Sequence, residues 1–468
     1  MSKPQKQVSA RDKKMPHDKM WRIIRSDAAR IHFVGIGGVS MRALARLTLL
    51  YHGARVSGSD REAFYEMEEL ISLGASVTVG HSPSLVDGAS LVVYSHAVHE
   101  DNPELLRAAE LSIPAVTRAE YLGVLMSDYT ARIGVSGTHG KSTTTAMLDL
   151  IFSCAGIAPT VVSGALLPCG STMKAGEHTA MIYEACEYKD SFLRFSPTHA
   201  IALNLELDHT DYFKDIGELR ESFRRAMSHA SECAVINYDD ENLSKIIPGI
   251  KSRVVTFGQR VLADYRYEIT GFLTEGYEFD VLHDGAPVGS FRLNVPGVYN
   301  VTNATAAIVC ALEYGIDVDI IKKAIAHYAG IQRRLEYIGD RHLRRVYYDY
   351  AHHPTEIASC INAVKMLTHG LVTVIFKPHT YSRTKSLWED FKRALSLADH
   401  IVLTDIYPAR EAPIDGITSA RLAYEIGDNA VLCSDEDVLH TVDSVTSGAI
   451  IIMGAGNMDA IRSAIIKD

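Results

Sequence analysis

The stretch from Arg132 to Ala155, RIGVSGTHGKSTTTAMLDLIFSCA, decides the fold of this chain. Arg132–Ser136 predicts a short buried strand, and Gly137–Lys141 predicts a tight glycine turn. Ser142–Ala155 has the length and apolar content of a helix. A strand that runs through a glycine turn into a helix is typical of a parallel α/β sheet, so we predict an α/β domain here.

The glycine turn has the composition of a phosphate-binding loop. Its residues are Gly137, Thr138, His139, Gly140, Lys141, Ser142 and Thr143. Glycines let backbone N–H groups converge on a phosphate, and the following helix adds its positive end. Lys141 can neutralise the β- and γ-phosphates, while the Ser142 hydroxyl can ligate Mg²⁺. The segment does not match the strict eight-position phosphate-loop pattern, because Val135 stands where that pattern has its first glycine. The alternative interpretation is a glycine-rich turn whose lysine is merely solvated.

Two polar side chains follow neighbouring strand candidates. Glu184 ends the strand Thr179–Glu184, and His209 comes soon after the strand Ala200–Asn204. Parallel strands gather the residues that follow them at one edge of the sheet, which places both beside the phosphate loop. Glu184 would complete the Mg²⁺ shell begun by Ser142, and His209 would hold a second metal or orient a substrate carboxylate. Taken singly, Glu184 could equally be a surface charge and His209 part of a helix N-cap.

A second glycine-rich turn lies near the start of the chain. Ile31–Val34 predicts a strand that runs into Gly35-Ile-Gly-Gly38, and Met41–Leu50 predicts the next helix. With the acidic Asp60 further along, this segment has features of a dinucleotide-binding fingerprint, so a dehydrogenase is an alternative. The third glycine of that fingerprint is replaced by Ser40, and a dehydrogenase leaves the phosphate loop unexplained.

The rest of the chain repeats the alternation of strands and helices. Further strands are expected at residues 55–57, 91–94, 346–348, 373–376, 401–404 and 450–453, and a further helix at 300–314. Residues 254–293 alternate in polarity and carry many turn residues, so we expect a small, partly antiparallel insert there. The length of 468 residues suggests three domains. We set their boundaries at 29–127, 128–330 and 331–468, after a flexible tail at 1–28.

Composition disfavours several classes of function. The net charge of −10, with no basic block beyond the N-terminal segment, argues against nucleic acid as a partner. No apolar run approaches the roughly 18 residues of a membrane span, and the polar N-terminus is not a signal peptide. The seven cysteines are scattered and form no C-x-x-C pair, which fits a reducing cytoplasm better than a disulfide framework. We therefore expect a cytoplasmic protein without a membrane partner.

At these motifs the chain resembles the Mur ligases, from about Ile31 to its C-terminus. The segments that carry the resemblance are Gly35 to Gly38, Ser57 to Asp60, Gly137 to Ser142, Glu184 to Glu187, Asn204 to Asp211, Asn300 to Asn303, Arg333-Arg334, Asp349 to Glu356, Pro378 to Thr384 and Met453 to Gly456. The Gly35-Ile-Gly-Gly start and the His-His-Pro-Thr-Glu run from His352 are similar to the alanine-adding members. The resemblance implies a Rossmann-like UDP-binding domain, a central P-loop ATPase-type domain and a C-terminal Rossmann-like α/β domain.

The resemblance also implies roles for the residues that match. Lys141 would bind the ATP phosphates, and Arg334 would contact the γ-phosphate. Ser142 and Glu184 would hold one Mg²⁺, and His209 would hold a second near the reacting carboxylate. Of these, the residues implied to be catalytic are Lys141, Glu184, His209 and Arg334.

Further residues are implied to bind the nucleotide and the substrates. Asn303 would meet the adenine of ATP, and Asp349 would meet its ribose. The residues implied for the UDP site are Gly37, Gly38, Ser59 and Asp60. Those implied for the amino acid or the transferred phosphate are His352, His379 and Arg383.

Some positions depart from the family pattern. They are Ser40, Arg42, Ser142, Cys186, Lys189 and Thr380. Ser40 makes the helix entry bulkier, Arg42 adds a positive charge near the expected diphosphate, and Thr380 puts one substrate contact in doubt. Residues 215–244 contain no lysine, so we expect no carbamylated lysine of the kind that several sibling ligases use.

The implied activity is the ATP-dependent joining of L-alanine to UDP-N-acetylmuramate in peptidoglycan synthesis. The sugar carboxylate would form an acyl phosphate, which the amine of L-alanine would then attack, with His209 or His352 taking the amine proton. Domain closure at hinges near residues 125–132 and 328–332 is expected, in a monomer or a homodimer. The alternatives are a sibling ligase, such as a murein-peptide recycling or polyglutamate-adding enzyme, and a non-catalytic nucleotide-binding protein.

Overall fold

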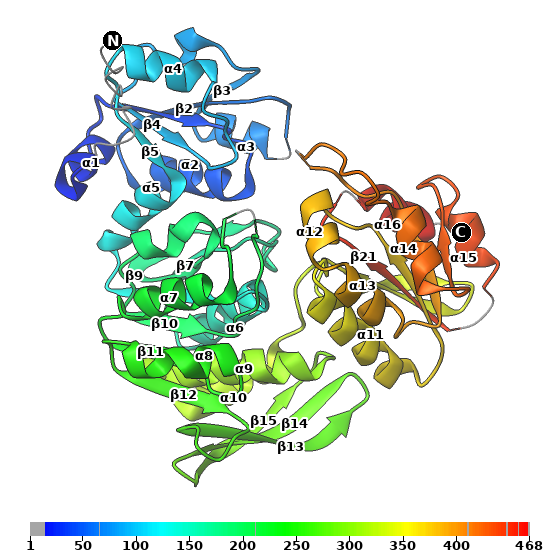
Figure 1. The fold of residues 1–468 in the computed structure, drawn as a ribbon. Coiled ribbons are helices and arrows are strands. Elements are labelled where there is room, and N and C mark those ends of the chain that lie inside the picture. The colour runs from blue at the N-terminus through cyan, green and yellow to red at the C-terminus, as the bar shows by residue number, and fades with distance from the viewer. Residues whose placement is uncertain are drawn as a thin grey trace, which may run out of the picture.

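The structure, a computed structural model, describes residues 15–64, 66–210, 212–409, 411–445, 448–456 and 458–466. Within these residues, three β-sheets covered by helices follow one another along the chain (Figure 1). The N-terminal sheet lies above the central sheet in the figure, and the C-terminal sheet stands to their right. This is the three-domain α/β fold expected from the sequence.

The N-terminal domain contains a parallel sheet with the strand order β3-β2-β1-β4-β5. Its strands are β1 (Arg30–Val34), β2 (Arg55–Asp60), β3 (Ser76–Val79), β4 (Leu91–Tyr94) and β5 (Ala115–Thr117). Its helices are α2 (Val39–Tyr51), α3 (Met67–Ser72), η2 (Pro83–Val86), α4 (Pro103–Glu110), α5 (Arg118–Leu125) and η3 (Met126–Asp128). The strand order reverses between β1 and β4, which opens a crevice at their carboxyl ends, where the first glycine turn lies.

The predicted flexible tail at residues 1–28 needs correction in its second half. His17–Ile24 forms the helix α1, and its Met20 and Ile24 are buried in the same core as α5. The two residues are one helical turn apart, so a single apolar stripe anchors an otherwise charged segment. That segment therefore belongs to the N-terminal domain, while residues 1–14 lie outside the described residues.

The central domain contains a sheet with the strand order β15-β14-β13-β12-β11-β10-β6-β9-β7-β8. Its strands are β6 (Ala131–Ser136), β7 (Pro159–Val162), β8 (Met173–Lys174), β9 (Glu177–Glu184), β10 (His199–Ala202), β11 (Cys233–Asn237), β12 (Val254–Gly258), β13 (Tyr265–Leu273), β14 (Gly276–His283) and β15 (Ala286–Leu293). Its helices are α6 (Lys141–Cys154), η4 (Tyr188–Arg194), α7 (Ile216–Met227), α8 (Glu241–Ile246), η5 (Ile247–Gly249), α9 (Val298–Tyr314) and α10 (Val318–His327). β13, β14 and β15 pair antiparallel, as predicted, but they extend the central sheet through β12.

The C-terminal domain contains a sheet with the strand order β16-β17-β21-β18-β19-β20. Its strands are β16 (Glu336–Arg341), β17 (Arg344–Asp349), β18 (Val372–Phe376), β19 (His400–Leu403), β20 (Ala430–Leu432) and β21 (Ala449–Met453). Its helices are α11 (Pro354–Thr368), α12 (Tyr381–Ser386), α13 (Trp388–Leu395), α14 (Ser419–Ile426), α15 (Val438–Asp443) and α16 (Asp459–Ile465). Only β16 runs antiparallel within this described sheet, so the other five carboxyl ends lie at one edge.

Buried side chains join the N-terminal and central domains into one body. A single apolar cluster runs from Leu44 of α2 and Leu122 of α5 to Phe192 and Phe223 of the central domain. The C-terminal domain has apolar clusters of its own. Because a shared core resists rotation, we expect movement mainly at the second linker, near residues 328–332. Among the described helices, none is long and apolar enough to span a bilayer.

Candidate active site

The phosphate loop lies at the carboxyl end of β6, and α6 begins directly after it at Lys141. Gly140 has a φ of +84°, in the left-handed region that favours glycine. A Cβ atom on Gly140 would lie 2.4 Å from Asn303 Oδ1, which leaves no room for another residue. The residue predicted to contact adenine, Asn303, therefore lies directly against the loop.

The side chain of Lys141 folds back over this loop. Its Nζ donates to the carbonyl oxygens of Gly137 and Thr138, the second at 3.1 Å, and lies 3.5 Å from Glu187 Oε2. Burial alone would lower the pKa of Lys141, but Glu187 and the other acidic groups nearby together outweigh burial and raise it. The ammonium group is therefore charged at neutral pH and lies where a phosphate would enter.

Glu187, rather than Glu184, stands between Lys141 and His209. Its Oε1 lies 3.6 Å from His209 Nε2, and its side chain is only 4% exposed. Glu184 instead accepts hydrogen bonds from Ser163 Oγ at 2.8 Å and from the backbone of Gly164 at 2.6 Å. Glu187 received no role from the sequence, although it closes the Glu-Ala-Cys-Glu segment that begins at Glu184. The structure thus places Glu187, a residue without a predicted role, next to both Lys141 and His209.

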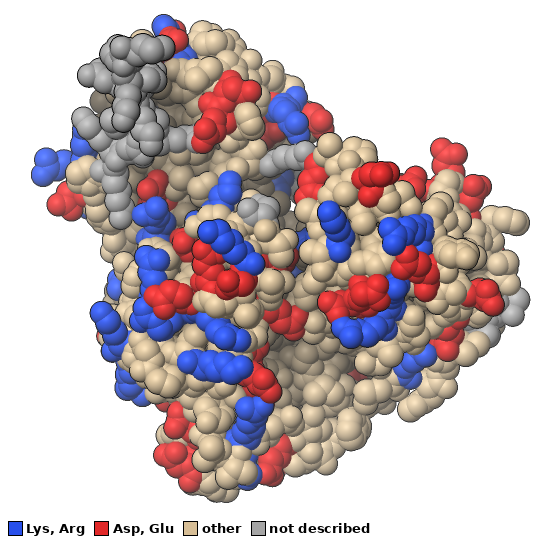
Figure 2. Space-filling view, in the orientation of Figure 1, with Lys and Arg blue, Asp and Glu red and all other residues tan. Residues whose placement is uncertain are grey.

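A cavity of about 200 Å³ separates the phosphate loop from the C-terminal domain. Of the residues predicted to bind ATP, those that line it are His139, Gly140, Thr143, Asn303, Arg334 and Asp349. Its other lining residues are Asn204, Glu206, Tyr299, Thr355, Glu356 and Ser359. Figure 2 shows the surface hollowed between the central and C-terminal domains, with acidic and basic side chains intermixed around it. The cavity joins residues from two domains that are far apart in the sequence.

Asp349 gives this cavity a group that titrates near pH 6. Its carboxylate accepts hydrogen bonds from the backbone N–H groups of Leu335 and Ala351, at 2.6 and 2.7 Å. Burial is the largest influence on Asp349 and raises its pKa to about 6, although Arg334 acts in the opposite direction. The carboxyl group is therefore ionised at pH 7 and protonated in mild acid.

We expect kcat/KM for ATP to fall as the pH drops through about 6. The reason is that a protonated Asp349 loses the negative charge that would accept hydrogen bonds from the ribose hydroxyls. The fall should approach about tenfold per pH unit below the pKa. Steady-state kinetics between pH 5 and 8 would measure this fall. The Asp349→Asn variant, which cannot ionise, should not show the fall in kcat/KM on the acid side of the pH profile. If the variant shows the same fall in mild acid, another group must cause it.

Arg383 connects the C-terminal domain to the segment that carries His209. Its Nη2 donates to both carboxylate oxygens of Asp208, at 3.1 and 3.2 Å, and its Nη1 donates to His379 Nδ1 at 3.1 Å. The Arg383 and Asp208 side chains are 14% and 13% exposed. Burial would raise the pKa of Asp208, but Arg383 lowers it far below its usual range. This ion pair therefore stays charged across the physiological pH range and holds the two domains together.

We expect Arg383→Ala to shift the protein toward an open arrangement of its C-terminal domain. Removing one partner leaves the Asp208 carboxylate buried without its countercharge, which costs about 3 kcal/mol or more when burial is complete and less here. Small-angle scattering should show a larger radius of gyration than in the unaltered protein, and ADP should partly restore it. Arg393→Ala is the matched control, because exposed Arg393 pairs with Asp390 of its own helix. Identical scattering profiles for the two variants would contradict the conclusion that the Asp208–Arg383 ion pair holds the domains together.

Two histidines of the C-terminal domain are neutral at pH 7. Burial lowers the pKa of His352 and of His379 to about 4. The Nδ1–H of His352 donates to the Tyr350 carbonyl oxygen at 2.9 Å, which leaves the lone pair on its Nε2. His379 stacks on Tyr407 with ring centroids 5.6 Å apart. His352 can therefore accept a hydrogen bond or a proton from an amine through its Nε2, whereas the Nδ1 lone pair of His379 already accepts from Arg383.

The residues predicted for the UDP site meet at the carboxyl ends of β1 and β2. The N–H of Gly37 donates to Asp60 Oδ2 at 2.8 Å, and Gly38 is the N-cap of α2. The hydroxyl of Ser59 is buried and donates to Glu104 Oε2 at 2.8 Å. The charge added by Arg42 is also balanced, since its Nε lies 3.3 Å from Glu66 Oε2.

Glu104 is a buried residue of this region that the sequence did not single out. Its carboxylate accepts from His32 Nε2 and lies 2.8 Å from His81 Nδ1, and its side chain is fully buried. Burial would raise the pKa of Glu104, but hydrogen bonds from the two histidines and Ser59 outweigh it and lower the value. This network fixes the edge of the N-terminal crevice. The sequence could not show it, because the four residues come together only in the folded protein.

Comparison with known proteins places all three domains in one family. The models that match are the Mur ligase family catalytic domain at residues 30–130, the Mur ligase middle domain at 135–311 and the Mur ligase glutamate ligase domain at 333–461. A UDP-N-acetylmuramate–L-alanine ligase from Alkaliphilus metalliredigens is 38% identical, over 94% of this chain and 97% of its own. One from Geobacter sp. is 40% identical, over 92% and 95%.

Solved structures agree with this relationship. The UDP-N-acetylmuramate–alanine ligase from Thermotoga maritima superposes with a TM-score of 0.78 at 27% identity, over 94% of this chain and 98% of that one. A murein peptide ligase from Psychrobacter arcticus shares the fold, with a TM-score of 0.69 at 22% identity over 93% and 98%. The phosphate loop, the cavity between two domains and these full-length matches lead to one conclusion: the chain belongs to the Mur ligase family.

Proposed function

We propose that this Mur ligase joins L-alanine to the lactyl carboxylate of UDP-N-acetylmuramate, with conversion of ATP to ADP and phosphate, in peptidoglycan synthesis. The observation that carries the proposal is the single cavity in which six residues expected to bind ATP meet across two domains. The choice of substrates is supported by the curated relatives of that name, which align with more than nine tenths of this chain at 38% and 40% identity.

The residues beside the phosphate loop fit the Mg²⁺ that this reaction needs. Glu187 Oε2 is a buried carboxylate oxygen without a hydrogen-bond partner among the described residues, and Ser142 lies in the first turn of α6. Mg²⁺ prefers oxygen ligands of this kind. When bound, the ion supplies neutralisation of the phosphate charge. The groups proposed to hold two such ions are Ser142, Glu184, Glu187 and His209.

The proposed reaction proceeds in two steps. The sugar carboxylate attacks the γ-phosphorus while Lys141 and Arg334 orient the phosphate, giving ADP and an acyl phosphate. The amine of L-alanine then attacks the acyl carbon, and inorganic phosphate leaves. The neutral imidazole of His352 is the proposed acceptor of the amine proton. The Asp208–Arg383 pair holds the C-terminal domain closed meanwhile, which excludes water from the acyl phosphate.

The test is phosphate release from ATP with Mg²⁺ and UDP-N-acetylmuramate, with and without L-alanine. Release that requires both substrates, together with a product that contains one alanine, is the expected result. A parallel reaction replaces L-alanine with the tripeptide L-alanyl-γ-D-glutamyl-meso-diaminopimelate. Release only with the tripeptide would move the protein to the recycling branch of the family, and release with neither would support a binding role.

A further inference from the structure

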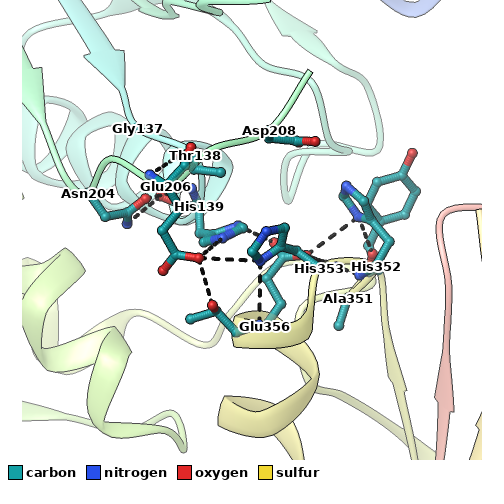
Figure 3. A network of polar contacts seen from close by, with 12 residues as sticks. Gly137, Thr138, His139, Asn204, Glu206, Asp208, Ala351, His352, His353 and Glu356 are labelled. Carbon is teal, nitrogen blue, oxygen red and sulfur yellow. Dashed lines mark hydrogen bonds and ion pairs between the residues drawn. The ribbon is translucent and has the colours of Figure 1, made fainter. Parts of the chain in front are cut away.

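Two histidines and a glutamate converge where the C-terminal domain meets the phosphate loop (Figure 3). His139 lies in the loop after β6, Glu206 follows β10, and His353 is the N-cap of α11. One potential ligand atom from each residue lies within 4.8 Å of those from the other two. Three side chains from two domains thus point toward one small volume.

Two of the three spacings between these atoms match a tetrahedral metal site, and the third lies within 4.8 Å. His139 Nε2 lies 3.5 Å from Glu206 Oε2, and His353 Nδ1 lies 3.3 Å from the same oxygen. Ligands bound at about 2.0–2.1 Å to a tetrahedral Zn²⁺ are about 3.3–3.4 Å apart. A cation could therefore be held by these atoms after only small side-chain shifts.

Surrounding side chains orient the three residues as metal ligands. His139 Nδ1 lies 3.1 Å from Glu356 Oε1, which leaves His139 Nε2 directed toward Glu206. That Nε2 is buried and has no hydrogen-bond partner among the described residues. A carboxylate behind one ring nitrogen is the usual support of a metal-bound histidine. Thr355 Oγ1 donates to Glu206 Oε2 at 2.6 Å and fixes the third ligand in the same way.

The charges around the cluster favour a cation between the rings. The pKa values of Glu206 and Glu356 are both lowered, so both are ionised at neutral pH. Burial and the charge of His139 lower the pKa of His353, so its imidazole is neutral. Its Nδ1 accepts a long hydrogen bond of 3.4 Å from the Thr355 backbone N–H, which a cation at Nδ1 would replace.

Arg334 also faces this cluster, and its Nη1 lies 3.5 Å from Glu356 Oε1. Burial would lower the pKa of His139, but Glu356 and Glu206 outweigh burial and raise it to about 9. His139 is therefore an imidazolium without a cation, and a dication would take the place of its Nε2 proton between the two carboxylates.

We propose that His139, Glu206 and His353 form a site for a borderline divalent cation of the zinc class, which ties the C-terminal domain to the phosphate loop. Two imidazole nitrogens suit Zn²⁺, Co²⁺ or Ni²⁺ and disfavour Mg²⁺, which takes oxygen ligands. The site is therefore distinct from the proposed Mg²⁺ ligands around Glu187. It does not depend on the identity of the ligase substrates. Because the ligands span two domains, a bound ion is expected to hold the closed arrangement and to slow turnover.

The test uses Co²⁺ as a spectroscopic probe on the full chain, without nucleotide or Mg²⁺. We expect one tightly bound Co²⁺ per chain by equilibrium dialysis, with the strong visible absorption of a tetrahedral site. Glu206→Gln keeps the shape of the side chain, and His353→Asn keeps an N-cap of α11. Each should weaken Co²⁺ binding at least about tenfold. His369→Asn is the matched control, because His369 ends the same helix at a φ of +48° that asparagine tolerates.

Two results would overturn the proposal. One is a failure of the unaltered protein to bind Co²⁺ with tetrahedral absorption. The other is equal affinity in the unaltered protein and in a folded Glu206→Gln or His353→Asn variant, as judged by thermal unfolding without metal. The two substitutions lie in different domains and each tests the site alone. If neither variant folds, a competition experiment on the unaltered protein decides. The proposal then requires that one equivalent of Zn²⁺ removes the Co²⁺ absorption and that excess Mg²⁺ does not.

Discussion

Replacing Lys141 with alanine is expected to lower kcat for phosphate release by about 10³-fold while leaving the fold intact. The ammonium group of Lys141 is the positive charge that emerges from the phosphate loop, and its pKa is raised, so it is always charged at neutral pH. Its contacts with the carbonyl oxygens of Gly137 and Thr138 are replaceable by water. The measurement is steady-state phosphate release, with circular dichroism as a check of folding.

Lys174→Ala provides the matched control for this variant. Lys174 also contacts α6, through a 2.7 Å ion pair with Asp149, but it lies at the opposite end of that helix from the loop. We expect Lys174→Ala to retain most of the activity of the unaltered protein. Activity retained by Lys141→Ala, or an equal loss in both variants, would remove the phosphate-loop assignment.

Glu187→Gln is expected to have the second-largest effect, lowering kcat about 10²-fold and raising the Mg²⁺ concentration needed for half-maximal rate about tenfold. The substitution removes the charge that lies 3.5 Å from Lys141 Nζ and 3.6 Å from His209 Nε2. An amide has only one acceptor oxygen, so it can no longer present an acceptor to both Lys141 and His209. Rates measured across a Mg²⁺ titration, and Mn²⁺ binding followed by electron paramagnetic resonance, would report both parts.

The comparison with Glu184→Gln decides which carboxylate is the principal metal ligand. Glu184 is engaged by Ser163 and by the backbone of Gly164, so we expect its variant to lose less activity and less Mn²⁺ affinity. The opposite order would restore the assignment made from the sequence, in which Glu184 and His209 hold the metals. Either order therefore identifies the ligand.

The elements that were predictable from sequence are those with buried, uninterrupted apolar runs. Leu91–Tyr94 was predicted as a strand and has these bounds, because all four residues are buried between helices. By contrast, β3 and β20 escaped notice because they lie at sheet edges and are largely exposed. Helix α1 was missed for a related reason, since only two of its residues reach the core.

The candidate site was predictable where its residues are contiguous in the chain. The phosphate loop depends on seven consecutive residues, and the pattern therefore named them all. Glu187 was missed because the argument from strand ends selects the last residue of β9, which is Glu184. The side chain that approaches His209 belongs to Glu187, three residues beyond the end of that strand. The contacts of His139 with Glu356 were hidden because the two residues belong to different domains. Such pairs are set by domain closure, which local sequence does not encode.

The position of β6 has a consequence for the lifetime of the site. β6 pairs with β10 and β9 on its two sides, and α6 is buried along most of its length, so neither can open without breaking the whole sheet. Their backbone amides should exchange with deuterium only through global unfolding, while those of residues 328–332 should exchange through small local openings. On heating, a destabilised variant would therefore lose closure of the C-terminal domain well before the phosphate loop unfolds. Inactivation by heat should then be reversible at first.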